Sequence, residues 1–337
     1  MSDQRLLEID GLRVDFTTRG GVVQAVRGVS LDVERGETVG LVGESGSGKS
    51  VTVQAAMGLV NVPGEIAAGD IRWKGQSLLG TSGRSYARRV RGRELSMIFQ
   101  DPMTSLNPVL DVGTQITEVL RHHLGMTKQR AWSRAGELLE LVGISNPDTR
   151  MRQYPHEFFG GMRQRVMIAA ALACEPELLI ADEPTTALDV TIQAQILELL
   201  GELQEKLHLS VLVITHDLGL VAGFCHRILV MYGGKIVEAG PATGIFERPG
   251  HPYTAGLLRS TPRLDVVNER LIAIDGSPPD PKNPLQGCAF RSRCPIAEAE
   301  CRNQPALDSC GEGREAACWL PFRDCWNPDL KRRQTVI

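Results

Sequence analysis

Alternating apolar and polar residues dominate the start of the chain and predict β-strands. Residues 5–16 and 22–33 each alternate, and the turn Arg19-Gly20-Gly21 separates them. A further short strand is expected at residues 71–73, before Lys74-Gly75. A period of two is typical of half-buried antiparallel strands. We therefore expect an antiparallel β subdomain in this part of the chain.

Short apolar runs then alternate with stretches of helical periodicity. Strands are expected at residues 38–42, 95–99, 178–181, 211–215 and 228–232, and helical patterns cover residues 50–57, 114–143, 158–173 and 191–207. Apolar strands that alternate with helices predict a mostly parallel sheet covered by helices. In such folds, ligand-binding groups gather at the carboxyl ends of the strands.

Residues 43–50 read Gly-Glu-Ser-Gly-Ser-Gly-Lys-Ser, the pattern GxxxxGKS, between an expected strand and an expected helix. Glycines allow several backbone N–H groups to point into one concavity, and the helix N-terminus adds positive potential there. Lys49 can reach the β- and γ-phosphates of a nucleotide, and the Ser50 hydroxyl can bind Mg²⁺. A chance glycine-rich turn is the alternative, but it does not explain the strand, the Lys-Ser pair and the helix together.

Polar residues also follow three other expected strands: Gln100, Asp182-Glu183 and His216. Asp182 can hold Mg²⁺, Glu183 can polarise an attacking water, Gln100 can position that water or complete the metal shell, and His216 can contact the γ-phosphate. The pattern predicts hydrolysis of ATP or GTP by in-line attack of water, with Lys49 and Mg²⁺ stabilising the developing charge. Phe16 is either a platform for the base or a core aromatic residue of an edge strand.

Length and composition restrict the class of protein. The 337 residues suit one large domain with a smaller one, or two medium domains. The net charge of −3 gives no sign of nucleic-acid binding. The most apolar stretch, residues 166–174, is far shorter than the about 18 residues of a membrane span, and no hydrophobic signal core follows Met1. We expect a cytosolic protein that can reach a membrane by docking to other subunits.

Eight cysteines divide into two groups. Cys174 and Cys225 are isolated among apolar residues and are expected to be core thiols. The other six lie between residues 288 and 325, and in a reducing compartment they indicate a metal or cluster site before disulfides. No CxxC pair is present, so spacing alone does not identify the metal.

The ordered motifs resemble those of the nucleotide-binding subunits of ABC transporters over about residues 5–250. Residues 43–50 match the Walker A loop, residues 178–182 the Walker B strand, residues 187–189 the D-loop and residues 158–162 the signature. The resemblance implies an α/β P-loop NTPase of the ABC type, with a RecA-like core, an antiparallel β subdomain and a helical subdomain at about residues 101–157. The implied domains are residues 1–250 and a small Cys-rich extension at residues 251–337.

Finer matches resemble the dipeptide and oligopeptide importer ATPases: residues 99–108, residues 181–190 and His251-Pro252-Tyr253-Thr254. This resemblance implies a subunit that hydrolyses ATP to energise import of peptides. Its implied partners are a second ATPase subunit, in a heterodimer, two transmembrane permeases and an extracytoplasmic peptide-binding protein, at the cytoplasmic face of the plasma membrane. Importers of glutathione, nickel or antimicrobial peptides, soluble ABC ATPases and a mainly regulatory partner subunit are the alternatives.

The resemblance also assigns roles to individual residues. It implies catalytic roles for Glu183, His216 and Gln100, and Mg²⁺ binding by Ser50, Gln100 and Asp182. ATP binding is expected of Gly43, Glu44, Ser45, Gly46, Ser47, Gly48, Lys49 and Ser50, and of Phe16 because of its position before the loop. The resemblance further implies a contribution to the partner's ATP site by Phe159, Gly160, Gly161 and Met162, and a D-loop role for Asp189.

One departure from the family pattern concerns the signature. Phe159 occupies the position where these importers have a serine whose hydroxyl contacts the γ-phosphate in the opposite subunit's site. Phe159 has no donor and is much larger. We therefore expect a weakened ATP site where this signature meets the partner's Walker A loop, with the other site competent. A tolerated substitution is the alternative.

The cysteine spacing in the tail resembles that of the peptide-importer ATPases. Four residues match the spacing: Cys288, Cys294, Cys301 and Cys318. The resemblance implies that they bind a [4Fe–4S] cluster, consistent with an all-thiolate site, with a structural or regulatory role. Zinc is the alternative, and Cys310 and Cys325 would be spare.

Overall fold

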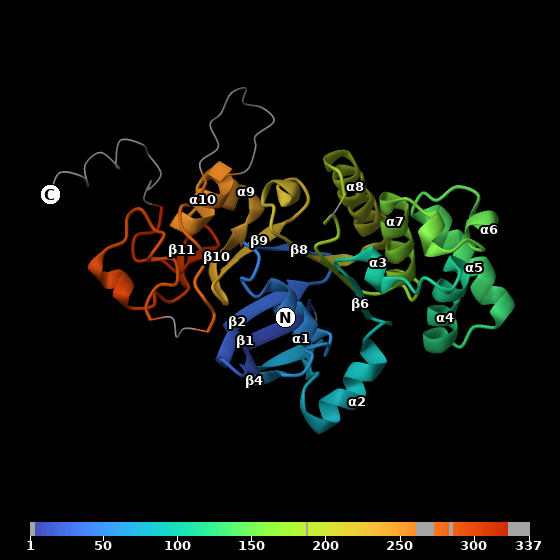
Figure 1. Cartoon of the computed structure of the whole chain (residues 1–337), viewed down its shortest axis with the longest axis horizontal. Helices are drawn as coiled ribbons and strands as arrows, with labels where there is room; N and C mark the ends of the chain where they lie inside the picture. The colour runs from blue at the N-terminus through green and yellow to red at the C-terminus, as the bar shows by residue number, and fades with distance from the viewer. Residues whose placement is uncertain (1–3, 187, 261–272, 283–285, 323–337) are drawn as a thin grey trace. The chain divides into compact units, whose positions relative to one another are not determined.

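The computed structural model describes residues 4–186, 188–260, 273–282 and 286–322 (Figure 1). The chain divides into two compact units. Unit 1 comprises Met1–Glu8, Asp32–Thr38 and Arg72–Ile214, and unit 2 comprises Ile9–Leu31, Val39–Ile71 and Thr215–Ile337. Within the described ranges, no helix combines the length and the apolar character that crossing a membrane requires.

Three parallel strands form the centre of unit 1: β6 (Leu95–Ile98), β7 (Leu178–Asp182) and β8 (Ser210–Thr215). Leu95 pairs with Leu178, and Leu178 pairs with Ser210. Every residue of the three strands is buried, as expected for parallel strands that are covered on both faces. Their carboxyl ends therefore lie along one edge of this part of the sheet, where the predicted polar residues follow.

Helices make up most of the rest of unit 1. They are α2 (Gly80–Val90), α3 (Pro102–Ser105), α4 (Val112–Leu124), α5 (Lys128–Leu141), α6 (Pro147–Arg150), η1 (Pro155–Glu157), α7 (Gly160–Ala171) and α8 (Val190–Leu207). In Figure 1, helices α4, α5, α6 and α7 (green) lie together, and α5 packs against both α4 and α7.

The continuous helical stretch expected at residues 114–143 is two helices. Gly125, with a φ of 63°, ends α4 in the left-handed conformation that glycine adopts at little cost. Thr127 then caps α5, because its side chain accepts a hydrogen bond from the Arg130 N–H. The apolar periodicity continues across this break, so the pattern of side chains alone did not reveal it.

Unit 2 contains a sheet with the order β11-β12-β10-β9-β3. The strands are β3 (Thr38–Val42), β9 (Arg227–Tyr232), β10 (Lys235–Pro241), β11 (Asp308–Gly311) and β12 (Arg314–Ala316). Strand β3 is parallel to β9, whereas β12 pairs antiparallel with β10 through Glu238 and Ala316. Residues of the tail thus extend this sheet, and the small Cys-rich extension expected from the sequence is not confirmed.

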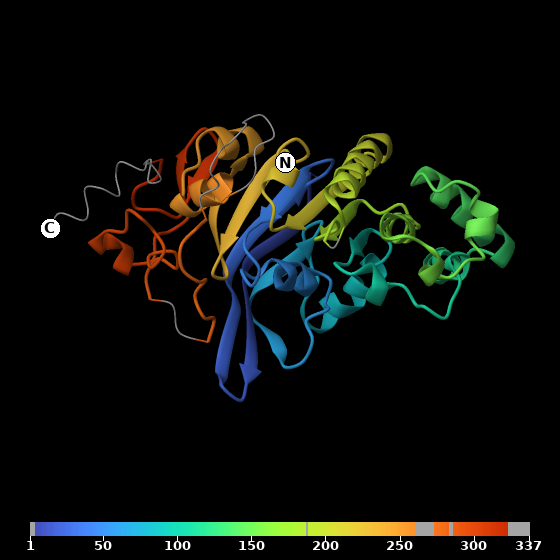
Figure 2. The same cartoon turned by 45° about the horizontal axis from the view of Figure 1, so that its top comes forward.

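The predicted antiparallel strands form a second sheet with the order β2-β1-β4-β5. Its strands are β1 (Arg5–Thr18), β2 (Gly21–Glu34), β4 (Gly64–Trp73) and β5 (Gln76–Ser77). Strands β1 and β2 make the long hairpin that is dark blue in Figure 2. The remaining elements are α1 (Lys49–Ala56), η2 (Gly219–Val221), α9 (Ala242–Glu247), α10 (Pro252–Ser260) and η3 (Ala299–Arg302).

Candidate functional site

The phosphate loop, residues 43–50, connects the buried strand β3 to helix α1, which begins at Lys49. A Cβ atom at Gly43 would lie 2.1 Å from the main-chain oxygen of Met231. Gly48 has a φ of 105°, and a Cβ atom there would lie 2.4 Å from the main-chain oxygen of Ala25. The loop therefore requires glycine at both positions, because a larger residue would collide with backbone atoms.

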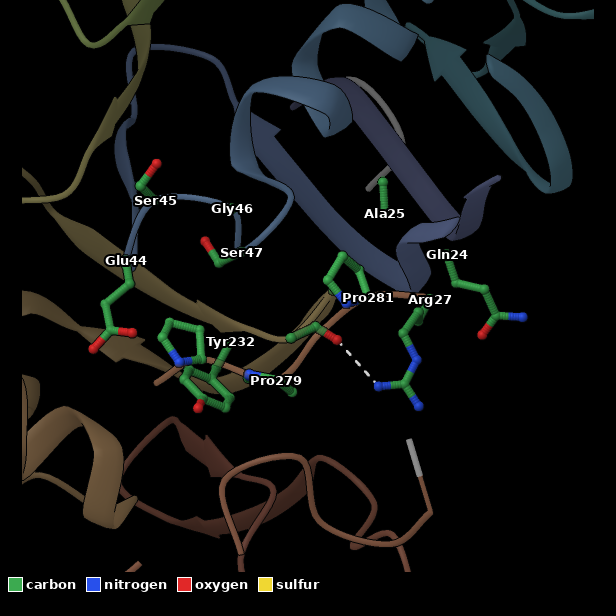
Figure 3. A pocket seen from close by; sticks show the side chains of 13 residues that line it. Gln24, Ala25, Arg27, Glu44, Ser45, Gly46, Ser47, Tyr232, Pro279 and Pro281 are labelled. Atoms are coloured by element: carbon green, nitrogen blue, oxygen red, sulfur yellow. Dashed lines mark hydrogen bonds between the residues drawn. The ribbon is translucent and has the colours of Figure 1, made fainter. Parts of the chain in front are cut away.

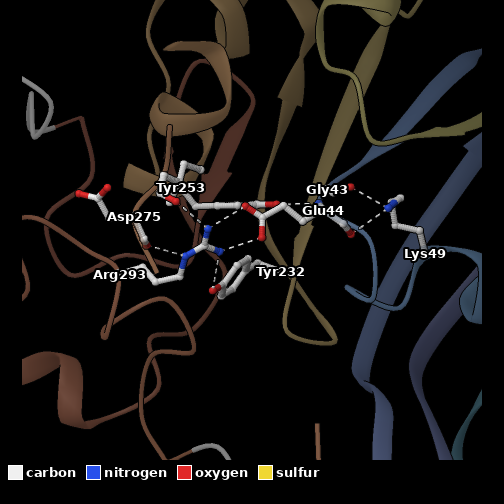
Figure 4. Close-up of polar contacts among 8 residues, drawn as sticks. Gly43, Glu44, Lys49, Tyr232, Tyr253, Asp275 and Arg293 are labelled. Atoms are coloured by element: carbon white, nitrogen blue, oxygen red, sulfur yellow. Dashed lines mark hydrogen bonds and ion pairs between the residues drawn. The ribbon is translucent and has the colours of Figure 1, made fainter. Parts of the chain in front are cut away.

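Lys49 lies inside this loop. Its side-chain nitrogen donates hydrogen bonds to the main-chain oxygens of Gly43, at 2.7 Å, and Glu44, at 3.0 Å (Figure 4), and the residue is 4% exposed. The hydroxyl of Ser47 is buried and has no hydrogen-bond partner among the described residues. A buried ammonium and an unpartnered buried hydroxyl in the same loop fit a phosphate group, which can accept hydrogen bonds from both.

Glu44, the second residue of the loop, is fixed by residues far away in the sequence (Figure 4). Its carboxylate accepts two hydrogen bonds from the Arg293 guanidinium, at 2.7 and 3.1 Å, and its N–H donates to the Tyr253 hydroxyl at 2.8 Å. Burial alone would lower the pKa of Arg293, but the hydrogen bonds to Glu44 and Tyr232 outweigh burial and raise it. No sequence pattern assigned a role to Arg293, and Tyr253 stood out only as part of the family-like segment His251-Pro252-Tyr253-Thr254.

Tyr253 is held by a buried hydrogen-bond network at the start of α10, formed with Glu238, Gly250 and His251. The Glu238 carboxylate accepts hydrogen bonds from the N–H groups of Gly250, at 2.5 Å, and His251, at 2.8 Å. The Tyr253 N–H in turn donates to Nδ1 of His251 at 3.0 Å. Burial raises the pKa of Glu238 and lowers that of His251 to about 3. His251 is therefore neutral at pH 7, and its Nδ1 acts as an acceptor.

The buried, neutral His251 predicts that the stability of the protein depends on pH. The unfolded chain protonates His251 near its ordinary pKa of about 6.5. The folded protein does not protonate it until about pH 3. The stability that comes from keeping His251 neutral is thus complete above pH 6.5 and is lost as the pH falls toward 3. Between pH 7 and pH 5 we expect a loss of about 2 kcal/mol in the free energy of unfolding.

Urea denaturation of the wild type and of the His251→Asn variant, each at pH 7 and pH 5, measures this loss. Asparagine can still accept the Tyr253 N–H but does not titrate, so the variant should lose less stability than the wild type between pH 7 and pH 5. His208→Asn changes an exposed histidine in the left-handed conformation and is the matched control. Parallel pH curves for wild type and His251→Asn would contradict the assignment.

A cavity opens beside the phosphate loop (Figure 3). Ser45, Gly46 and Ser47 of the loop line it together with Arg27 and Tyr232. Arg27 donates a hydrogen bond to the main-chain oxygen of Gly233 at 3.1 Å. Prolines 278, 279 and 281 of the tail also line the cavity, so the tail and the loop share one space.

The acidic pair lies at the end of β7 in unit 1. Asp182 is 3% exposed and is the last residue of the strand. Glu183 has a φ of 45°, a left-handed conformation that is unusual for glutamate. Its Oε2 atom accepts hydrogen bonds from Gln100 Nε2, at 3.0 Å, and from the Thr186 hydroxyl, at 2.8 Å. The structure thus brings Gln100 and Glu183 together, because they follow the adjacent parallel strands β6 and β7.

The predicted signature segment begins helix α7, with Phe159 at the N-cap position. The Phe159 side chain makes no capping hydrogen bond and is 83% exposed. A Cβ atom at Gly161 would lie 2.8 Å from Cγ2 of Ile192, so the glycine allows α7 to approach the start of α8 closely. Asp189 caps α8 by accepting a hydrogen bond from the Ile192 N–H at 3.0 Å.

Other predicted site residues are found at separate positions. His216 is exposed and follows β8, and the half-buried Phe16 lies against Gly64, where a Cβ atom would be 2.6 Å from the ring. The loop and His216 belong to unit 2, whereas Gln100, Asp182 and Glu183 belong to unit 1. Ala187 of the predicted D-loop lies outside the described residues.

The tail cysteines give no recognisable metal-binding group in the part of the chain that is described. There, no three His, Cys, Asp or Glu side chains lie close enough together to hold a metal ion. The Cys288 N–H donates to the main-chain oxygen of Cys301 at 3.0 Å, and burial raises the pKa of Cys288 and takes that of Cys318 to about 11. Burial thus favours the neutral thiols, whereas a [4Fe–4S] cluster or zinc would bind these residues as thiolates. Cys325 lies outside the described residues.

Comparison with known protein families gives two matches. Residues 26–186 match the family described as ABC transporter. Residues 237–301 match the oligopeptide/dipeptide transporter C-terminal region.

Curated relatives match over almost the whole chain. The dipeptide transport ATP-binding protein DppD of Bacillus subtilis is 52% identical over 94% of this chain and 95% of its own length. The oligopeptide transport ATP-binding protein OppD is 54% identical in Bacillus subtilis, over 95% of this chain and 90% of that protein. In Salmonella typhimurium it is 49% identical, over 95% of each.

Solved structures share the fold. The dimeric ATP-binding cassette MJ0796 in a post-hydrolysis state with ADP and Pi superposes with a TM-score of 0.62 at 25% identity, over 70% of this chain and 99% of that one. CbiO1 of Clostridium perfringens, part of an ABC transporter complex, gives a TM-score of 0.61 at 25% identity, over 72% of this chain and 91% of that one. These matches support the ABC-type P-loop ATPase fold that the motifs predicted.

Proposed function

Since this chain belongs to the family of ATP-binding subunits of dipeptide and oligopeptide transporters, we propose that it hydrolyses ATP to energise the import of short peptides. The observation that carries the proposal is the phosphate loop closed around the buried Lys49. Glycines at both tight positions and the buried Ser47 hydroxyl leave the loop suited to a nucleotide's phosphates. A soluble ATPase without a transport role is not favoured, because the relatives are named as transport subunits.

The chain's own residues have distinct roles in the proposed reaction. Lys49 and the loop amides bind the β- and γ-phosphates, and Phe16 stacks on the base. We assign Mg²⁺ binding to Ser50, Asp182 and Gln100, and the ion would neutralise charge on the phosphates. Glu183, fixed by Gln100 and Thr186, orients and polarises the attacking water, and His216 contacts the γ-phosphate.

The assembly that we propose contains this chain, a second ATPase subunit in a heterodimer, two transmembrane permeases and an extracytoplasmic peptide-binding protein. Within it, the chain lies at the cytoplasmic face of the plasma membrane. We assign ATP binding to residues 1–250, with a helical subdomain at about residues 101–157 that meets the permeases, and a second role to residues 251–337. The separate family matches at residues 26–186 and 237–301 support two functional parts.

The iron–sulfur cluster stays a prediction that rests on the resemblance of the four tail cysteines. In its favour, the charges of Cys288 and Cys301 act on the pKa of Cys318, so these three thiols lie in one neighbourhood. Iron, sulfide and zinc analysis of protein purified without oxygen distinguishes cluster, zinc and free thiols. No step of ATP hydrolysis requires the cluster.

Reconstitution into lipid vesicles tests the proposed function. The chain is assembled with its permeases and second ATPase subunit, and uptake of labelled di- and tripeptides is measured with the binding protein present. We expect peptide accumulation that requires ATP. ATP hydrolysis that is unaffected by the permeases, without accumulation of any peptide, would contradict the proposal.

A further inference from the structure

Arg293 joins the tail to the phosphate loop with every donor that it has. Its guanidinium donates to both carboxylate oxygens of Glu44, to the Tyr232 hydroxyl and to the main-chain oxygens of Ile274 and Asp275. These five acceptors match the five N–H donors of arginine. The side chain of Arg293 is only 5% exposed. One buried residue of the tail therefore fixes the orientation of a phosphate-loop residue (Figure 4).

Glu44 places a negative charge in the loop that is expected to bind phosphates. Its main-chain oxygen accepts a hydrogen bond from Lys49, the residue expected to reach the phosphates. A carboxylate at this position repels an anionic ligand of the loop unless a cation neutralises it. The bidentate pair with Arg293 supplies that cation, and its planar fork holds the carboxylate in one orientation, which a lysine could not do.

We propose that Arg293 is a positioning residue of the nucleotide site: it holds Glu44 in place and neutralises a charge that would otherwise repel the phosphates of ATP. The tail then contributes to ATP binding through the ion pair between Arg293 and Glu44. This inference rests on the proposed binding of ATP by the phosphate loop. The Tyr253 hydroxyl supports the same residue from another side by accepting the Glu44 N–H.

Binding of MgATP to full-length variants tests the inference. Arg293→Met leaves the Glu44 carboxylate unpaired beside the loop, and we expect affinity for MgATP to fall about 10-fold at low salt. The deficit should shrink at high salt, because ions screen the repulsion. Glu44→Gln removes the charge itself and should cost about threefold or less. The double variant should bind like Glu44→Gln, because no unpaired carboxylate remains.

In the assembled transporter, Arg293→Met should raise KM for ATP about 10-fold and leave kcat within about twofold. Arg302→Met replaces an exposed arginine of the same tail and should bind MgATP like the wild type. Unfolding curves report whether each variant is folded.

Two results would overturn the inference. One is wild-type affinity in a folded Arg293→Met variant. The other is a double variant that binds as weakly as Arg293→Met at every salt concentration, which indicates a purely structural role. If Arg293→Met does not fold, Glu44→Gln decides the matter, since a loss of about 10-fold in this variant rules out repulsion by Glu44. If the wild type does not bind MgATP, the proposed function fails instead.

Discussion

Replacing Glu183 by glutamine should lower ATP turnover of the assembled transporter by about 100-fold or more, with ATP binding nearly unchanged. The amide keeps the size of the side chain but cannot polarise the attacking water. Turnover is measured by phosphate release at saturating ATP, and binding by equilibrium titration with MgATP.

The geometry around Glu183 is the reason for expecting so large an effect. Its backbone is held at a φ of 45°, and its N–H donates to the main-chain oxygen of Ile214 at 2.9 Å. Hydrogen bonds from Gln100 and Thr186 orient its carboxylate. A glutamate whose backbone is kept in a rarely populated conformation, with its carboxylate oriented by several contacts, indicates a functional role.

Glu177→Gln is the matched control. Glu177 precedes β7 and forms ion pairs with Lys74 and Arg35. Partly exposed ion pairs contribute little, so this variant should keep most of its turnover. If Glu183→Gln retained more than half of the wild-type turnover, Glu183 would not be the residue that polarises the water.

Phe159→Ser should raise turnover about 10-fold or more when it is combined with Glu183→Gln. In the heterodimer that we propose, the site built on this chain's own loop would be inactive in that background, so the remaining hydrolysis would come from the site that the signature segment completes for the partner subunit. The new hydroxyl can donate to a phosphate oxygen, and hydrogen bonds to charged groups contribute about 1.5–3 kcal/mol.

The structure favours this result because the Phe159 side chain is not needed for packing inside its own subunit. It is 83% exposed at the N-terminus of α7 and leaves that helix without a side-chain cap. Serine at this position also caps the helix, which is worth about 1 kcal/mol. Val62→Ser shortens another exposed apolar side chain and should leave turnover unchanged. An unchanged rate in the Phe159→Ser combination would show that the substitution is tolerated.

Local patterns predicted the elements that determine the fold. Apolar runs identified β3, β6, β7 and β8 to within one residue, because strands buried on both faces have a simple composition. Local patterns also placed Gln100 and Glu183 at the carboxyl ends of strands, and the structure added that these strands, β6 and β7, are neighbours. The break at Gly125 was missed because the apolar periodicity continues through it, and the strands of the tail were missed because they are very short.

The sequence by itself determined the phosphate loop and the family, because contiguous residues carry that chemistry and their spacing is strict. Only the tertiary structure decided what surrounds the loop. Glu44 and Arg293 are 249 positions apart, and neither residue belongs to a periodic pattern that would predict the pair. For the tail cysteines, the spacing predicted a metal site, and this site stays a prediction because spacing does not determine whether the side chains converge. Contacts of this kind depend on how distant segments fold against each other.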